Sequence, residues 1–521
     1  MKKIKPQIIF FVITLFFLKS SFAQTTFQKV IPLGFNLTTN GIKGGMPFGT
    51  GYLIVGSSLM FIDSLQVPVW KNVGNMGISS IKKLSNNNLI AIGISQTNTN
   101  VKLFKINSLG DTVWTKTFVD TVLNRTSIPI NIDVTPSGNF MFGGLLEDVI
   151  DKAFFIKTDS NANIIWNKII NVGSDIFLTS TKLTADGGII AAGSVDGQTS
   201  NTVAIKLDSN GAVEWTMKYF GVFNAKDIIE TTDGGFAFVA TSFQNSFVTA
   251  DVMLVKTDRF GVVEYAKTYG SAFGDEGETI QQLPNNDFII SGRKQDTLGG
   301  GGSCFSIGPC YDFYLIKTTS LGDTIFTRMY GDNGFDVPAS LDVNVDGGFT
   351  MIGQFQNDFG FNTGTYIVKT DSLGLTGNCN FTYTNTNTRV GNVNLTFIPI
   401  SVTIDSGFTT THQPIIYTRQ NIVGANTVTI CSSATVGIND IEQEKNEVQI
   451  FPNPGNEQLT IETDLTQGEF EMYDLVGRLV LTHTIKSNIE TINTAHLPKG
   501  TYIYRISTAI GFPSVGKWMK N

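Results

Sequence analysis

The chain is poor in charge, histidine and cysteine, and each shortage narrows the possible functions. Only 16% of its 521 residues are Asp, Glu, Lys or Arg, and the net charge of −7 includes no basic cluster. Binding to nucleic-acid phosphates needs clustered Lys and Arg, so we expect no nucleic-acid partner. The chain has three His and four Cys, and no His neighbours a Cys. We therefore expect neither a metal site nor a cofactor.

Long apolar runs are also absent, apart from one near the N-terminus. A basic start precedes an apolar stretch at residues 8–18, which has the length of a signal-peptide core and is short for a membrane span. The small residues that follow predict cleavage between Ala23 and Gln24. We therefore expect residues 1–23 to be a signal peptide, and we expect the mature chain to be exported without a transmembrane helix.

The four cysteines fit an oxidising compartment. Cys304 and Cys310 lie in one Gly-rich stretch, whereas Cys379 and Cys431 bracket a separate segment. We favour the local pairs Cys304–Cys310 and Cys379–Cys431 over the two other connectivities. Four free thiols are the remaining alternative.

What the chain has in place of charge is a β-rich composition arranged in repeats. A phrase of two short strands and a tight turn, DVMLVKTDRFGVVEYAKTYG at residues 251–270, occurs seven times in intact or decayed form. Its turn residues are Asp63, Asn107, Asp159, Asp208, Asp258, Thr319 and Asp371. A period near fifty residues with strand chemistry throughout predicts propeller blades. The fold is therefore expected to be all-β, with a seven-bladed β-propeller at residues 24–375.

Each repeat contains four strand patterns, except the last. In one complete unit, strands are expected at residues 226–232, 236–243, 251–257 and 262–269. The last unit lacks its fourth strand, and residues 26–34 resemble such a strand. We expect this N-terminal strand to pair with residues 366–370 and to complete the seventh blade, which removes an edge prone to aggregation.

An aromatic residue recurs at one place in the fourth strand. These residues are Trp70, Trp114, Trp166, Trp215, Tyr265 and Phe326, with Phe27 in the N-terminal strand. Large rings at one repeated position indicate packing between blades, and a ring of aromatics that stack on sugar is the alternative. The turn acids, such as Asp258, indicate hairpin formation, since a calcium loop needs several alternating acids.

Two segments after the repeats change in character. Residues 376–436 are rich in Thr and Asn with short apolar runs, and they predict a small β-appendage or linker braced by Cys379 and Cys431. Residues 437–446 are charged and carry no strand pattern, which predicts a flexible joint.

Residues 447–521 have short-strand patterning that predicts a compact β-sandwich. Its characteristic residues are Pro452, Asn453, Pro454, Tyr473, Gly477, Arg478, Gly500, Tyr502 and Lys517. In order and spacing, they resemble the type A C-terminal sorting domain of the type IX secretion system of Bacteroidota. This resemblance implies that the secretion machinery is a partner, that the domain is removed at the 437–446 joint, and that the cargo is secreted or held at the outer-membrane surface. A merely structural β-sandwich is the alternative.

The repeats resemble blade units of exported bacterial propellers, and this resemblance concerns fold only. No motif identifies catalytic residues, because the His residues lie outside the propeller and no Gly-rich stretch has the form of a phosphate loop. The longest insertion, residues 294–311, contains Cys304 and Cys310 and is the most specific lead. A neutral surface insertion is its alternative.

We expect an exported protein that binds a glycan or another protein. A propeller-based glycosidase or lyase is the second hypothesis, and it would need facing carboxylates in the central pocket. A structural surface or adhesion component is the third. The sequence does not decide whether the protein is an enzyme.

Overall fold

The chain consists of β-strands throughout the part that the computed structural model describes. The described residues are 26–32, 42–49, 51–56, 59–63, 68–73, 76–95, 99–123, 125–196, 201–243, 250–295, 303–304, 308–331, 334–356, 363–377, 382–384, 386, 388–412, 418–421, 428–432, 449–463, 468–474, 478–507 and 514–521. The predicted signal peptide and its cleavage site at Ala23 and Gln24 lie outside them. The chain divides into two compact units, Met1–Thr435 and Val436–Asn521.

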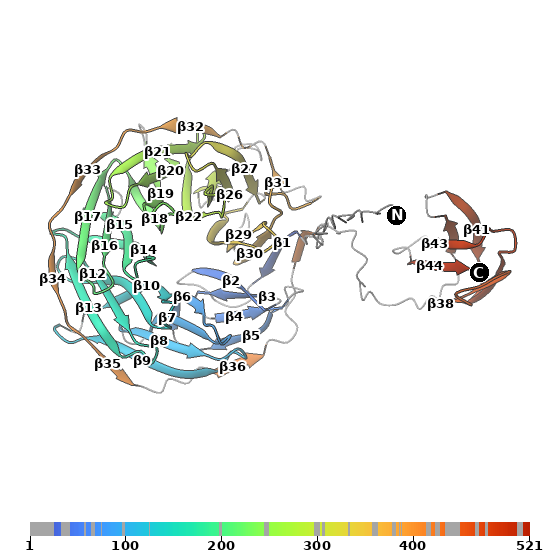
Figure 1. Ribbon diagram of the computed structural model, residues 1–521, viewed down its shortest axis with the longest axis horizontal. Coiled ribbons are helices and arrows are strands. Elements are labelled where there is room, and N and C mark those ends of the chain that lie inside the picture. The colour runs from blue at the N-terminus through green and yellow to red at the C-terminus, as the bar shows by residue number, and fades with distance from the viewer. Residues whose placement is uncertain are drawn as a thin grey trace, which may run out of the picture. The chain divides into compact units, whose positions relative to one another are not determined.

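The first unit contains seven five-stranded sheets arranged in a ring (Figure 1), which confirms the seven-bladed β-propeller. The first strands of blades 1 to 7 are β2 (Gly44–Phe48), β6 (Met76–Lys83), β10 (Ser127–Val134), β14 (Ile176–Leu183), β18 (Phe223–Glu230), β22 (Asp275–Gln282) and β28 (Val337–Val343). The second strands are β3 (Gly51–Val55), β7 (Leu89–Ser95), β11 (Phe140–Leu146), β15 (Ile189–Val195), β19 (Phe236–Phe243), β23 (Phe288–Gln295) and β29 (Phe349–Gln356).

The outer pair of each blade corresponds to the repeated phrase. The third strands are β4 (Leu59–Ile62), β8 (Val101–Ile106), β12 (Lys152–Thr158), β16 (Asn201–Leu207), β20 (Ala250–Thr257), β26 (Tyr311–Thr318) and β30 (Thr363–Lys369). The fourth strands are β5 (Pro68–Val73), β9 (Thr112–Asp120), β13 (Ile164–Asn171), β17 (Val213–Phe220), β21 (Val263–Gly270), β27 (Thr324–Tyr330) and, for blade 7, β1 (Phe27–Pro32).

The turn between third and fourth strands has the chemistry that its acid predicts. In blade 5, the Asp258 carboxylate accepts hydrogen bonds from the backbone N–H groups of Phe260 and Val262, at 2.8 and 2.9 Å. Gly261 has a φ of 78°, which an L-residue with a side chain rarely adopts. The Asp therefore forms the hairpin and is not a site residue.

The N-terminal strand closes the ring. β1 runs antiparallel to β30, with Phe27 opposite Lys369 and Val30 opposite Tyr366, in the pairing that the sequence predicts. Gln28 is fully buried in this sheet and accepts a hydrogen bond from the Tyr366 hydroxyl at 2.6 Å. Blade 7 is therefore built from both ends of the propeller sequence.

Residues 382–432, which we call the belt, differ from the predicted small appendage. They supply one outer strand to every blade, and Figure 1 shows them running around the outside of the ring. These strands are β31 (Thr382–Tyr383), β32 (Arg389–Asn392), β33 (Thr396–Pro399), β34 (Thr403–Asp405), β35 (Phe408–His412), β36 (Thr418–Asn421) and β37 (Val428–Ser432). They cover blades 6, 5, 4, 3, 2, 1 and 7 in that order. Such short strands cannot enclose a core of their own, but they can pair with an open sheet edge.

The second unit has two sheets over a shared core, which fits the predicted β-sandwich. One sheet holds β38 (Gln449–Phe451), β39 (Gln458–Glu462) and β42 (Ile489–Asn493). The other holds β41 (Leu479–Ile485), β40 (Gly468–Tyr473), β43 (Gly500–Ser507) and β44 (Ser514–Lys520). Phe470 and Trp518 are fully buried between them.

Candidate functional site

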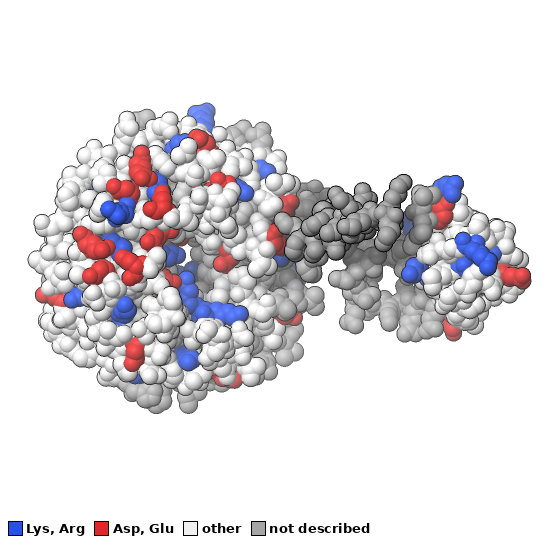
Figure 2. All heavy atoms as spheres, viewed as in Figure 1, with Lys and Arg blue, Asp and Glu red and all other residues white. Residues whose placement is uncertain are grey.

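The seven first strands surround a central cavity of about 830 Å³, and each of them contributes to its lining. Figure 2 shows acidic and basic side chains gathered around the centre of the ring. A cavity of this volume falls within the usual range for small-molecule sites. It is therefore the candidate site of the propeller.

A β-bulge in the first strand shapes this cavity. In six blades the pairing of the first and second strands shifts by at least one residue at the same place. The residues at the shift are Ser79, Ile130, Thr179, Lys226, Glu278 and Ala339, and all of them line the cavity. A bulge re-aims the unpaired residue, so each of these six blades offers one side chain of its own to the cavity.

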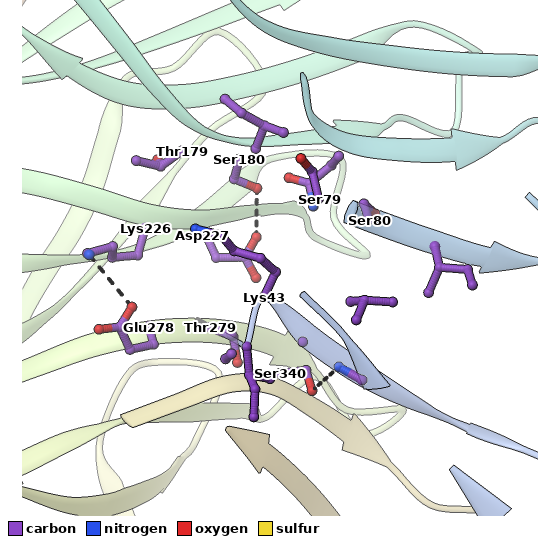
Figure 3. Close-up of a pocket in the computed structure, with 18 of the residues that line it drawn as sticks. Lys43, Ser79, Ser80, Thr179, Ser180, Lys226, Asp227, Glu278, Thr279 and Ser340 are labelled. Atoms are coloured by element: carbon purple, nitrogen blue, oxygen red, sulfur yellow. Dashed lines mark hydrogen bonds and ion pairs between the residues drawn. The ribbon is translucent and has the colours of Figure 1, made fainter. Parts of the chain in front are cut away.

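The residue after the bulge is polar in all six of these blades. The set is Ser80, Asn131, Ser180, Asp227, Thr279 and Ser340. Ser180 donates a hydrogen bond of 2.7 Å to the Asp227 carboxylate in the next blade. The Ser340 hydroxyl accepts from the backbone N–H of Gly45 at 3.0 Å, and it thereby joins blade 7 to blade 1 (Figure 3). These side chains fix the blades to one another around the cavity.

Ion pairs between neighbouring blades add to this framework. Lys82 pairs with Asp133 at 2.9 Å, Lys182 with Asp227 at 3.2 Å. Lys226 lies 3.7 Å from Glu278, and both face the cavity in Figure 3. Burial raises the pKa of Glu278, while Lys226 opposes that shift. Two acids of the lining are thus already paired with lysines.

Asp342 is a further acid of the lining. Burial raises its pKa to about 6, and the charges of Lys82 and Lys182 oppose the shift. Burial alone would lower the pKa of Lys182, but the carboxylates of Asp227 and Asp133 outweigh burial and raise it. Asp342 is therefore a group in the cavity whose protonation changes near pH 6.

The repeated aromatic residues whose side chains are described lie between blades and are not among the residues that line the cavity. The ring of Trp215 is 5.5 Å from that of Phe236 in the next blade, and its indole N–H donates to the Arg259 carbonyl there. Equivalent contacts join Trp114 to Phe140, Trp166 to the Ser209 carbonyl, Tyr265 to the Ser320 carbonyl, and Phe326 to Phe349. The side chain of Trp70 lies outside the described residues.

The insertion in blade 6 contains a short hairpin, β24 (Ser303–Cys304) and β25 (Gly308–Pro309). Cys310 is buried and disulfide-bonded. The side chains of Cys304 and Cys431 and the whole of Cys379 lie outside the described residues. The two pairings therefore stay predictions.

The characteristic residues of the second unit hold its two ends together. The Asn453 side chain donates to the Lys517 carbonyl at 2.8 Å and accepts from the Met519 N–H at 3.0 Å. The Trp518 indole N–H donates to the Pro452 carbonyl at 2.9 Å. The motif around Pro454 is thus fastened to the last strand, β44.

The other characteristic residues of this unit have local contacts or extend into solvent. The Tyr502 hydroxyl donates to the Pro498 carbonyl at 2.6 Å. Arg478 pairs with Asp474 at 2.7 Å, and its side chain is 79% exposed. Tyr473 and Gly500 lie in β40 and β43, and Gly477 is outside the described residues.

The polar residues that follow the bulges, which together form a polar ring around the cavity, were not predicted from the sequence, although the sequence contains a signal for them. Each of its members lies six residues before the turn that joins the first and second strands, as Ser180 does before Asp186 and Asp227 before Asp233. Alignment of the repeats on that turn would have placed the ring. Alignment on the later turn, at Asp258 and its equivalents, does not.

Among the described residues, no group of three or more His, Cys, Asp or Glu side chains is placed to hold a metal ion. The same residues include no helix that is long and apolar enough to cross a membrane.

Comparison with protein families identifies the second unit. Residues 449–520 match the family model described as "Secretion system C-terminal sorting domain". The chain therefore carries the sorting domain of the type IX secretion system, and it is exported to the cell surface or secreted. The domain also implies an interaction with the secretion machinery.

Solved structures offer distant likenesses to the chain. A putative gluconolactonase is 10% identical, with 66% of this chain and 92% of that one covered and a TM-score of 0.35. A DUF4221 family member from Bacteroides vulgatus is 10% identical, with 67% and 98% covered and a TM-score of 0.33. PorZ, a surface component of the type IX secretion system of Porphyromonas gingivalis, is 9% identical, with 94% and 87% covered and a TM-score of 0.19. At these TM-scores the propeller assignment rests on the sheet topology. No curated protein matches the chain.

Proposed function

We propose that this exported protein is a binding protein whose central cavity holds a small, hydroxyl-rich ligand, such as part of a glycan. One observation carries the proposal. The first strand of each blade contributes residues to a cavity of about 830 Å³, and in six blades the residue that follows the bulge is polar. A site with fixed hydroxyl, amide and charged groups suits a ligand with many hydroxyl groups.

The engagement of the acids supports binding over hydrolysis. Asp227 is paired with Lys182 and hydrogen-bonded to Ser180. Glu278 is paired with Lys226. A glycosidase needs two carboxyl groups, one as acid and one as base or nucleophile, on opposite sides of the scissile bond. Here these two acids already serve contacts between blades.

Titration calorimetry of the purified full chain with a panel of oligosaccharides tests the proposal. We expect Ser79→Trp, which fills the cavity from the bulge of β6, to weaken binding at least about tenfold, because the new ring occupies the ligand volume. The control is Ser372→Trp, which adds the same ring at an exposed hairpin turn. Equal binding by the two variants contradicts the proposal.

A carbohydrate-active enzyme is the second candidate, and Asp342 is the observation that favours it. A carboxyl group with a pKa of about 6 can act as a general acid near neutral pH. If the protein cleaves any oligosaccharide of the panel, Asp342→Asn should abolish the activity and leave binding intact. Product analysis by chromatography would detect cleavage, and its absence from all substrates would remove this candidate.

A further inference from the structure

A second cluster of side chains lies where blade 6 meets the segment that leads into blade 7. The Arg293 guanidinium carbon is 5.2 Å from the ring centroid of Tyr311 and 5.8 Å from that of Phe335. The two rings are 5.5 Å apart and nearly perpendicular, at 82°. Arg293 also forms an ion pair of 2.6 Å with Glu276. The four side chains form what we call the aromatic cluster.

The backbone holds this cluster in place. The Tyr311 N–H donates to the Gly334 carbonyl at 3.1 Å, and the Asp336 N–H donates to the Tyr311 carbonyl at 2.7 Å. Tyr311 and Phe335 are thus joined by a bridge between strands of different blades. The cluster remains accessible, because the side chains of Arg293 and Glu276 are 21% and 20% exposed and both rings are half-buried.

The cluster does not belong to the repeat. The position of Tyr311, eight residues before the Thr319 turn, holds Ala250 in blade 5 and Asp151 in blade 3. The position of Phe335, five before Ser340, holds Asp175 in blade 4. Arg293 lies eight residues after Asn285, which is in the turn between the first and second strands. The same position holds Thr241 in blade 5 and Ser194 in blade 4. A structural role common to all blades therefore does not explain it.

The cluster is linked through β22 to the lining of the central cavity. Glu276 and the cavity residue Glu278 are next-but-one neighbours on β22, and Arg293 acts electrostatically on both. The cluster also includes the end of the blade 6 insertion, since Tyr311 directly follows the disulfide-bonded Cys310. A ligand in the cavity can therefore extend over the two rings.

We infer that Tyr311 and Phe335, with the Arg293–Glu276 ion pair beside them, form a second sugar subsite for a neutral oligosaccharide that also enters the central cavity. Sugar rings present apolar C–H faces and a rim of hydroxyl groups, which match aromatic faces flanked by a planar ion pair. The charges balance, because Arg293 is neutralised by Glu276 and Lys226 by Glu278. Neither of these two pairs therefore offers an unpaired cation to an anionic ligand.

This inference rests on the proposed function, and one calorimetric experiment separates the two. The purified full chain is titrated with neutral gluco-, xylo-, manno- and chito-oligosaccharides and with oligogalacturonates as the anionic comparison. Tyr311→Leu and Phe335→Leu should each bind the preferred neutral oligosaccharide about tenfold more weakly. Tyr311→Phe should stay within about twofold of wild type, because it keeps the ring.

The control is Phe260→Leu, because Phe260 is an exposed ring that also has an arginine beside it, with the Arg259 guanidinium 4.6 Å away. Its binding should equal that of wild type. If Ser79→Trp abolishes binding while the two leucine variants bind normally, the cavity proposal stands and the subsite is wrong. Tighter binding of oligogalacturonates contradicts the neutral ligand, and no binding of any oligosaccharide by wild type overturns both proposals. Thermal melting of each variant excludes misfolding as the cause, and if one leucine variant fails to fold, the other tests the subsite.

Discussion

The strands of the blades and those of the belt belong to the same seven sheets, yet they differ in burial. The second strand of blade 5, β19, buries all but the last of its residues, whereas all residues of the belt strand β34 are exposed. The blade strand has neighbours on both sides and packs on both faces. The belt strand pairs with β13 alone. The strand β34 is therefore held largely by backbone hydrogen bonds, and the blades by apolar burial. Elsewhere the belt adds apolar contacts of its own, since Phe408 is buried against Phe154 and Phe397 packs against Tyr219.

This difference teaches what the belt contributes. A propeller leaves one open strand edge per blade, and such an edge can pair with strands of other molecules. The belt occupies that edge in all seven blades. We expect its contribution to show mainly in solubility and in resistance to unfolding, and that of the blades in the existence of the fold itself.

The largest effect should follow removal of the closing strand. Deletion of residues 24–34 removes β1 from between β30 and β37, so both lose a partner. It also leaves the buried Tyr366 hydroxyl without its acceptor Gln28. We expect the melting temperature to fall by more than about 10 °C, as measured by calorimetry. An unchanged melting temperature would show that the ring does not depend on β1.

Removal of the belt should have a smaller effect. A chain that ends at residue 377 lacks the second unit and the outer strand of each blade, and it keeps four strands in every blade. We expect it to fold, to melt about 5 °C lower than wild type, and to aggregate at lower protein concentration, because its edges are open. Light scattering and circular dichroism measure both effects. If this variant is as unstable as the one without β1, the belt belongs to the core and the comparison fails.

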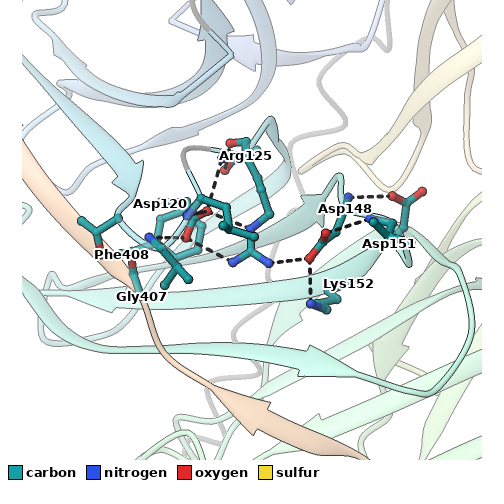
Figure 4. Close-up of polar contacts among 12 residues, drawn as sticks. Asp120, Arg125, Asp148, Asp151, Lys152, Gly407 and Phe408 are labelled. Atoms are coloured by element: carbon teal, nitrogen blue, oxygen red, sulfur yellow. Dashed lines mark hydrogen bonds and ion pairs between the residues drawn. The ribbon is translucent and has the colours of Figure 1, made fainter.

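A single residue tests where the belt is fastened. Thr121 donates two hydrogen bonds to the Gly407 carbonyl of the belt, and the adjacent Asp120 is fully buried against Arg125, at 2.8 Å (Figure 4). Arg125 also pairs with Asp148 at 2.7 Å.

Arg125→Ala should therefore destabilise the propeller by about 3 kcal/mol, because it leaves a buried carboxylate without its counter-charge. Chemical denaturation gives the free energy of unfolding. Arg259→Ala, at an outer turn, is the control, and equal stability of the two variants would remove this network as an anchor.

The smallest effect concerns the cavity and depends on pH. Burial raises the pKa of Asp342 to about 6 in the folded state, above its ordinary value of 3.8. Its contribution to stability is therefore complete below pH 4 and is lost as the pH rises through about 6. At pH 7.5, Asp342→Asn should be more stable than wild type by about 1–2 kcal/mol, and at pH 4 the two should be equal.

Denaturation curves at the two pH values test this prediction. The control is Asp405→Asn in the exposed belt strand β34, which should follow wild type at both. A pH dependence that is the same in wild type and Asp342→Asn would contradict the assignment.

The repeat made most of the propeller predictable. Strands expected at residues 236–243 and 251–257 are found at Phe236–Phe243 and Ala250–Thr257, because their ends are set by local turn chemistry. The belt was not predictable in the same way. Its strands are only two to five residues long. Apolar residues alternate at Val393, Leu395 and Phe397, but they pack against a blade, so the structure depends on an edge that is distant in sequence.

Contacts between distant residues explain what else was missed. The aromatic cluster joins Glu276, Arg293, Tyr311 and Phe335, and no two of them form a recognised motif. The network of Asp120, Arg125 and Asp148 joins two loops that follow different strands. In both places the repeat predicts the course of the backbone, whereas the contacts between side chains become known only from the three-dimensional structure.

The composition of blade 7 has a consequence for the order of folding. Its sheet unites strands from residues 27–32, 337–369 and 428–432, so most of the propeller sequence separates its partners. Contacts of such sequence separation are slow to form, because a long loop must close first. During synthesis β1 has no partner until residue 363 has emerged, and β37 cannot pair before residue 428. The ring is therefore expected to close last, and a chain interrupted before the belt ends keeps an unpaired strand.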